Sequence, residues 1–109
     1  MSGLKIDLRG EAENDIDLAL EYYLAEAGQR VALDFLDALQ RCYRLVSENP
    51  NMGSTGIGRR IRRHDVRQVA VGRFPYLMFY VPTADRVEVR RILHAQRDFS
   101  ATLVSPDEE

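Results

Sequence analysis

The sequence predicts a small α+β domain, in which a short N-terminal strand and an antiparallel helical hairpin precede a three-stranded antiparallel meander. The first half of the chain repeats apolar residues at helical spacing, whereas the second half is rich in β-branched and aromatic residues divided by short turns. The length of 109 residues fits one domain. We therefore expect residues 1–98 to form this domain and residues 99–109 to form an acidic, mobile tail.

The predicted elements begin with a strand in which Lys5 alternates with Leu4, Ile6 and Leu8, and which Gly10 ends. Acidic residues then crowd the first turn of a helix, where they oppose the positive end of its dipole. Its expected apolar stripe is Ile16, Leu20, Tyr23, Leu24 and Ala27, followed by Gly28 as the cap. The stripe of a second helix is Val31, Phe35, Leu39, Cys42 and Val46, flanked by Leu36 and Tyr43.

The second helix should stop at Asn49-Pro50, because proline cannot continue a helix. Residues 51–58 contain three glycines and predict an exposed, flexible loop; no lysine follows that would indicate a phosphate-binding loop. Strands are expected at residues 66–71, 76–81 and 86–93, separated by turns at 72–75 and 83–85. Connections this short require neighbouring strands to be antiparallel.

Several classes of function are disfavoured by composition. Cys42 is the only cysteine and falls in a helical apolar stripe, so we expect a core residue without redox or nucleophilic chemistry. No histidine or cysteine spacing suits a metal, and we expect neither a metal nor another cofactor. The longest apolar run, residues 76–81, is too short to span a membrane, and residues 1–9 lack the apolar centre of a signal peptide. We expect a cytoplasmic protein without membrane contact.

Charge is sorted along the chain although the formal net charge is only −2. Residues 1–58 carry five basic and ten acidic groups, residues 59–98 carry ten arginines against four acids, and residues 99–109 carry three acids. Arginine binds carboxylates and phosphates with a planar pair of donors. The second half therefore predicts a basic surface for an acidic partner or a nucleic acid.

Two motifs stand above this background. The first is the arginine cluster at residues 59–63, where four cations within five residues favour an anionic partner. The alternative is a charged edge strand that prevents aggregation. The second is residues 94–98, where His94 and Arg97 could transfer a proton and hold a phosphate, or could be structural, as a hydrogen-bonded capstone and an ion pair. The expected partner-binding residues are Arg59, Arg60, Arg62, Arg63, Arg73, Tyr76 and Arg97.

The order and spacing of several segments together resemble the ParE branch of the ParE/RelE toxin superfamily over nearly the full length. These segments are residues 11–15 leading into Tyr22-Tyr23, 32–39, 48–53, 71–76 with Tyr80, and 87–94 with Arg97-Asp98. The resemblance implies the toxin of a type II toxin-antitoxin pair, which inhibits DNA gyrase without being an enzyme. It also implies a ParD-like antitoxin that neutralises the toxin in a hetero-oligomer.

The related RelE-type toxins cut messenger RNA on the ribosome, and the sequence departs from their pattern. Residues 76–80 contain no arginine, and Arg97 is followed by Phe99 but by no tyrosine. We therefore expect no catalytic residues. Two alternatives stay open: a ribosome-dependent ribonuclease that relies on His94 and Arg97, and a module that binds an antitoxin but has lost toxicity.

Overall fold

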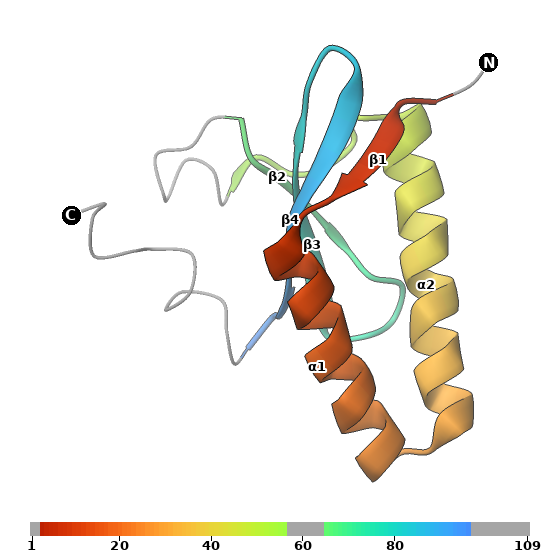
Figure 1. The fold of residues 1–109 in the computed structure, drawn as a ribbon. Coiled ribbons are helices and arrows are strands. Elements are labelled where there is room, and N and C mark those ends of the chain that lie inside the picture. The colour runs from red at the N-terminus through yellow and green to blue at the C-terminus, as the bar shows by residue number, and fades with distance from the viewer. Residues whose placement is uncertain (1–2, 57–64, 97–109) are drawn as a thin grey trace.

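The computed structural model describes residues 3–56 and 65–96, and it has the α+β class that the sequence predicts. Two helices pack on one side of a four-stranded mixed sheet (Figure 1). In chain order the elements are β1 (Lys5–Leu8), α1 (Gly10–Glu26), α2 (Gln29–Glu48), β2 (Arg67–Ala70), β3 (Tyr76–Pro82) and β4 (Arg86–His94). Neither helix is long and apolar enough to cross a membrane within these described residues.

The sheet has the strand order β1-β4-β3-β2. β2 pairs with β3 and β3 with β4, both antiparallel, as the short turns require. β1 extends this meander into a mixed sheet, because it lies parallel to β4 with Lys5 opposite Arg86 and Leu8 opposite Val89. The alternation of residues 4–8 predicts a strand but carries no information on its partner, so the sequence does not indicate this pairing.

The two helices run in opposite directions and meet at a tight turn (Figure 1). The N–H groups of Ala27 and Gly28 both donate to the carbonyl of Tyr23, at 2.8 and 2.9 Å. Gly28 has a φ of 95°, a conformation that a residue without a Cβ adopts at little cost. Gly28 thus ends α1, as predicted, and also precedes the first residue of α2.

The buried face of α1 differs from the expected stripe. Leu24 is 54% exposed and Ala27 is also exposed, so both were wrongly placed in the core. The residues of α1 that are buried are Ala12, Asp15, Ile16, Ala19 and Tyr23. α1 packs against β4, and the small side chains of Ala12 and Ala19 allow the helix to approach the strand closely. The spacing of apolar residues alone did not reveal that the buried face includes Ala12 and Ala19 and excludes Leu24 and Ala27.

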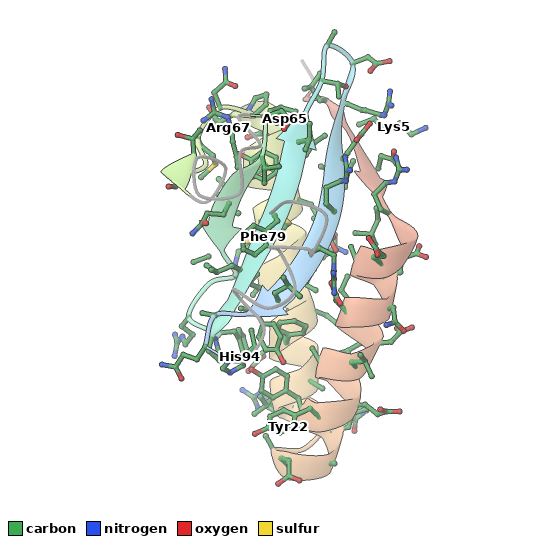
Figure 2. All side chains as sticks on the ribbon, turned by 90° about the vertical axis from the view of Figure 1, so that its left-hand side faces the viewer. Lys5, Tyr22, Asp65, Arg67, Phe79 and His94 are labelled. Carbon is green, nitrogen blue, oxygen red and sulfur yellow. The ribbon has the colours of Figure 1, made fainter. Side chains whose placement is uncertain are left out.

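The main core lies between the helices and the sheet, and the predicted stripe of α2 enters it. Cys42 is 6% exposed, and its thiol donates to the carbonyl of Ala70 at 3.2 Å, so its expected place in the core is confirmed. Successive side chains of a strand point to opposite faces. Accordingly Met78 and Tyr80 belong to this core, whereas Phe79 and Val81 belong to a second apolar cluster on the other face, where Figure 2 shows Phe79.

Candidate functional site

Only part of the expected partner-binding surface lies within the described residues. Arg73 and Tyr76 are described, as is His94, which belongs to the alternative catalytic hypothesis, and all three lie on or next to the strands β3 and β4. Arg59, Arg60, Arg62, Arg63 and Arg97 lie outside the described residues. The pairing of His94 with Arg97 is therefore not defined by the structure.

Tyr76 lies in an aromatic cluster inside the protein. Its side chain is 4% exposed, and its ring centroid lies 5.3 Å from that of Phe35 and 6.1 Å from that of Tyr23. The first residue of β3 was expected at the partner-binding surface, but its ring fills the space between the sheet and the helices. The surface that we propose below therefore does not include Tyr76.

His94 caps the same aromatic cluster. Its ring meets the ring of Tyr76 edge to face with centroids 5.3 Å apart, and its Nδ1 accepts the backbone N–H of Gln96 at 3.2 Å. Figure 2 shows His94 at the end of the sheet nearest the tip of the helical hairpin, where Tyr22 lies. Of the two roles that the sequence left open, this geometry favours the structural one.

Most described arginines of the second half already have partners within the protein. Arg86 contacts Glu88 at 2.8 Å, and this hydrogen bond is the main reason why the pKa of Arg86 is raised. Arg90 contacts the same carboxylate at 3.1 Å, and Arg91 contacts Asp15 at 2.8 Å. The expectation of a broad basic surface is therefore wrong for β4, where the charges are neutralised locally.

Arg73 is different from these arginines. It is exposed in the turn between β2 and β3, and its side chain forms no ion pair or hydrogen bond within residues 3–56 and 65–96. Gly72, which precedes it, has a φ of 56°. A Cβ at Gly72 would lie 3.2 Å from the Cβ of Ala38, so this glycine lets the turn approach α2 closely. Arg73 is therefore held beside α2, with its charge unpaired as far as the described residues are concerned.

The loop after α2 is anchored to the sheet by Tyr80. The hydroxyl of Tyr80 donates to the carbonyl of Pro50 at 2.8 Å and accepts the N–H of Gly53 at 3.0 Å. Arg67 donates to the carbonyls of Asn51 and Gly53, both at 2.9 Å. Ser54 also pairs with Gln68 across an isolated β-bridge. These contacts hold residues 51–54 against the sheet, so the expectation of a flexible loop is wrong there, whereas Asn51, Met52 and Ser54 are exposed as expected.

These anchoring contacts lie just before the segment that carries the arginine cluster in the sequence. No motif in the sequence indicated them, because an internal tyrosine and a single arginine are common in strands. The signal that could have pointed to Tyr80 is its hydroxyl group, because a tyrosine inside an otherwise apolar strand usually needs a hydrogen-bond partner. The contact itself brings together residues 27 positions apart, which only the fold decides.

Burial disfavours ionisation of the groups that could act as nucleophiles or bases in the core. It raises the pKa of the Cys42 thiol, although the backbone of Gly72 and the charge of Arg41 oppose this effect. Burial also raises the pKa of Tyr80, and the N–H of Gly53 opposes it. Among the described residues, no group of three or more histidine, cysteine, aspartate or glutamate side chains is arranged to hold a metal.

Comparisons relate the chain to known proteins. The model of a family described as "ParE toxin of type II toxin-antitoxin system, parDE" matches residues 6–99. A solved structure described as the chromosomal ParDE toxin-antitoxin system from P. aeruginosa has a similar fold, with a TM-score of 0.70. It is 18% identical, and the match covers 85% of this chain and 97% of that chain, so this likeness shows the fold alone. No match is found among curated proteins.

Proposed function

The chain belongs to the ParE toxin family of type II toxin-antitoxin systems, and from this premise we propose that it inhibits DNA gyrase when free and that a ParD-like antitoxin neutralises it. The family match over residues 6–99 is the observation that carries the proposal. Toxin and antitoxin form a hetero-oligomer, and the toxin acts by binding instead of by turning over a substrate.

The geometry around His94 supports binding over catalysis. A general base must reach the proton that it removes. The Nδ1 atom of His94 is already hydrogen-bonded to the backbone of Gln96, and its ring packs on Tyr76. The strand β3, with the sequence Tyr76-Leu77-Met78-Phe79-Tyr80-Val81-Pro82, carries no cation that could stabilise a pentavalent phosphate.

The proposed contact surface combines Arg73 with the arginine cluster of the sequence. Arg73 is exposed, and its guanidinium has no ion pair among the described residues. The other members are Arg59, Arg60, Arg62, Arg63 and Arg97. Contacts between these cations and an acidic antitoxin, or gyrase and its DNA, are driven by charge, so added salt should weaken them.

The gyrase proposal is tested with the purified, antitoxin-free chain. The chain is added to DNA gyrase acting on relaxed plasmid, and in parallel to ribosomes translating a message whose integrity is followed. We expect supercoiling to be inhibited while the message stays intact. Cut message with normal supercoiling would contradict the proposal and move the chemistry to His94 and Arg97. Antitoxin binding without either effect would leave a module that only binds its antitoxin.

The role of the arginine cluster is tested by substitution. A variant with Arg59, Arg60, Arg62 and Arg63 all changed to alanine should lose gyrase inhibition and bind the antitoxin more weakly. The control changes Arg30 and Arg44 to alanine, since both are exposed on α2 and have no ion pair among the described residues. If the fourfold variant behaves like this control, the cluster does not bind a partner and is only a charged, solvent-exposed edge strand.

A further inference from the structure

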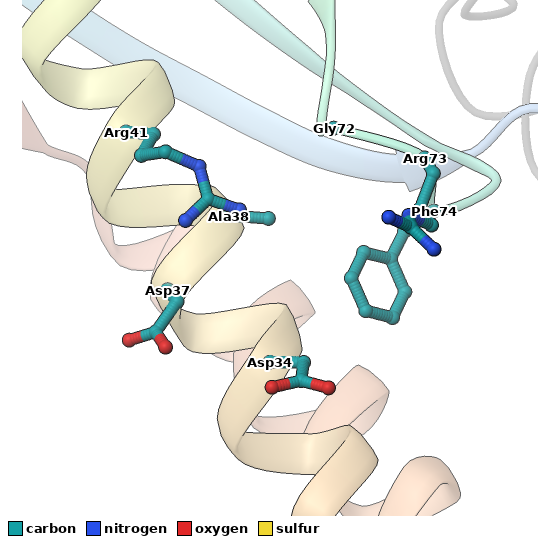
Figure 3. Close-up of a pocket in the computed structure, with 7 residues that line it drawn as sticks. All are labelled: Asp34, Asp37, Ala38, Arg41, Gly72, Arg73 and Phe74. Carbon is teal, nitrogen blue, oxygen red and sulfur yellow. The ribbon is translucent and has the colours of Figure 1, made fainter.

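A pocket of about 420 Å³ lies between α2 and the turn that joins β2 to β3 (Figure 3). Its wall on α2 is formed by Asp34, Asp37, Ala38 and Arg41, and its opposite wall by residues 72–74. The close approach of Gly72 to Ala38 brings the two walls together. The volume is within the usual range of binding pockets, roughly 300–1,000 Å³.

The pocket is lined by two acids and two arginines. The carboxylates of Asp34 and Asp37 and the guanidinium of Arg73 form no ion pair or hydrogen bond in the part of the chain that is described, and the same holds for Arg41. Asp37 and Arg41 have the i, i+4 spacing at which opposite charges on a helix often pair. Among the described residues, none of these four charges is neutralised by a direct contact, so we treat all four as available to a ligand.

The mixture of charges indicates what kind of ligand fits. A purely acidic ligand would be attracted by Arg41 and Arg73 but repelled by Asp34 and Asp37. A ligand that carries both signs satisfies both pairs. Phe74, which is half-buried, adds apolar surface to the pocket, and this suits the aliphatic stem of a long side chain. A peptide segment with neighbouring basic and acidic side chains meets these requirements.

We propose that this pocket receives a segment of the antitoxin whose basic side chain contacts Asp34 and Asp37 and whose neighbouring acidic side chain contacts Arg41 and Arg73. This inference rests on the proposed function, since it assumes that an antitoxin binds the chain. It adds a determinant of specificity: an antitoxin with the wrong charge at either position leaves a like-charge contact in the pocket. The pocket thus helps to select the cognate antitoxin.

The experiment measures the binding of a ParD-like antitoxin by calorimetry. One variant combines Asp34→Asn with Asp37→Asn, and the other combines Arg41→Gln with Arg73→Gln. The matched control for the first is Asp17→Asn with Glu21→Gln on α1, where both side chains are exposed. The matched control for the second is Arg30→Gln with Arg44→Gln. Each control changes the net charge by the same amount as its pocket variant.

We expect each pocket variant to bind the antitoxin roughly tenfold or more weakly, because it leaves charges of the partner unpaired. Each control should stay within about threefold, since it alters only screened surface charge. All substituted side chains are exposed, and unchanged thermal unfolding would show that the fold is intact. Affinities that match those of the controls would overturn the inference.

A charge-inverted variant separates local recognition from long-range attraction. Asp34→Lys and Asp37→Lys together with Arg41→Glu and Arg73→Glu leave the net charge of the chain unchanged. We expect this variant to lose antitoxin binding while the toxin still folds; retained affinity would overturn the inference. If the wild-type chain itself does not bind the antitoxin, the proposed function fails, and that outcome differs from every result above.

Discussion

Asp15 on α1 and Arg91 on β4 are 76 residues apart in the chain and form a two-point ion pair. Nε of Arg91 lies 2.8 Å from Oδ2 of Asp15, and Nη2 lies 3.0 Å from Oδ1. The same carboxylate accepts the backbone N–H of Ile92 at 2.9 Å. β1 pairs with β4 only as far as Val89. Asp15 therefore accepts the backbone N–H of Ile92 at a part of the β4 edge that β1 does not cover.

Substitution of Asp15 should destabilise the fold strongly. The change Asp15→Ala leaves the partly buried guanidinium of Arg91 and the N–H of Ile92 without this acceptor, and we expect a loss of about 3 kcal/mol in the free energy of unfolding. Urea unfolding measures it. The control Asp17→Ala, at an exposed position of the same helix, should change the free energy by less than about 0.5 kcal/mol. Equal effects of the two substitutions would contradict the role of Asp15.

The hydroxyl of Tyr80 should stabilise the loop after α2. The change Tyr80→Phe keeps the ring in the core but removes both hydrogen bonds, to Pro50 and Gly53. We expect a loss of roughly 1–3 kcal/mol, because a buried donor and an acceptor lose their partner. Hydrogen exchange at the Gly53 amide should accelerate more than exchange in α2. Unchanged protection of that amide would show that the hydroxyl does not anchor the loop.

The two described glycines of this loop should respond differently to alanine. A Cβ at Gly53 would lie 2.7 Å from the hydroxyl of Tyr80 and 2.9 Å from the carbonyl of Gln68. A Cβ at Gly56 would have its nearest neighbour at 3.6 Å. Gly53→Ala should therefore destabilise the protein by roughly 1–3 kcal/mol, and Gly56→Ala should be nearly neutral. Thermal unfolding of the pair tests this ordering, and the reverse order would contradict the close packing at Gly53.

Stability should fall at alkaline pH in part through Tyr43. Burial, and then the charge of Cys42, raises the pKa of Tyr43 from 10.0 to about 12. Between these values the unfolded chain loses the proton while the folded chain keeps it, so the free energy of unfolding decreases as the pH rises. Below about pH 10 the contribution is complete. Tyr43→Phe should therefore show a smaller decrease between about pH 10 and pH 12 in urea unfolding. An equal decrease in both proteins would show that groups other than Tyr43 cause the loss of stability.

Elements with a strong local signal were predicted well from the sequence. The end of α2 before Asn49-Pro50 follows from the geometry of proline, and the turns at residues 72–75 and 83–85 fix the antiparallel meander. The core position of Cys42 follows from its place in a helical apolar stripe. In each case, the structure of a segment is determined by residues that are close together in the chain.

The candidate site was harder to predict for a physical reason. The count of arginines in the second half is correct, but Arg67, Arg86, Arg90 and Arg91 are bound to carbonyls or carboxylates that the fold brings to them. Free charge is what remains after these contacts form. Within the described residues, the sequence could not show that Arg73 keeps its charge available while its neighbours on β4 do not.

The sequence by itself determined the α+β class, the order of the elements and the resemblance to ParE toxins, because periodicity, turn residues and motif order are local properties of the chain. Tertiary structure decided the parallel pairing of β1 with β4, the Asp15–Arg91 ion pair, the anchoring of Gly53 by Tyr80 and the charged pocket beside α2. These features join residues far apart in the chain, and their energies depend on distances that no local pattern encodes.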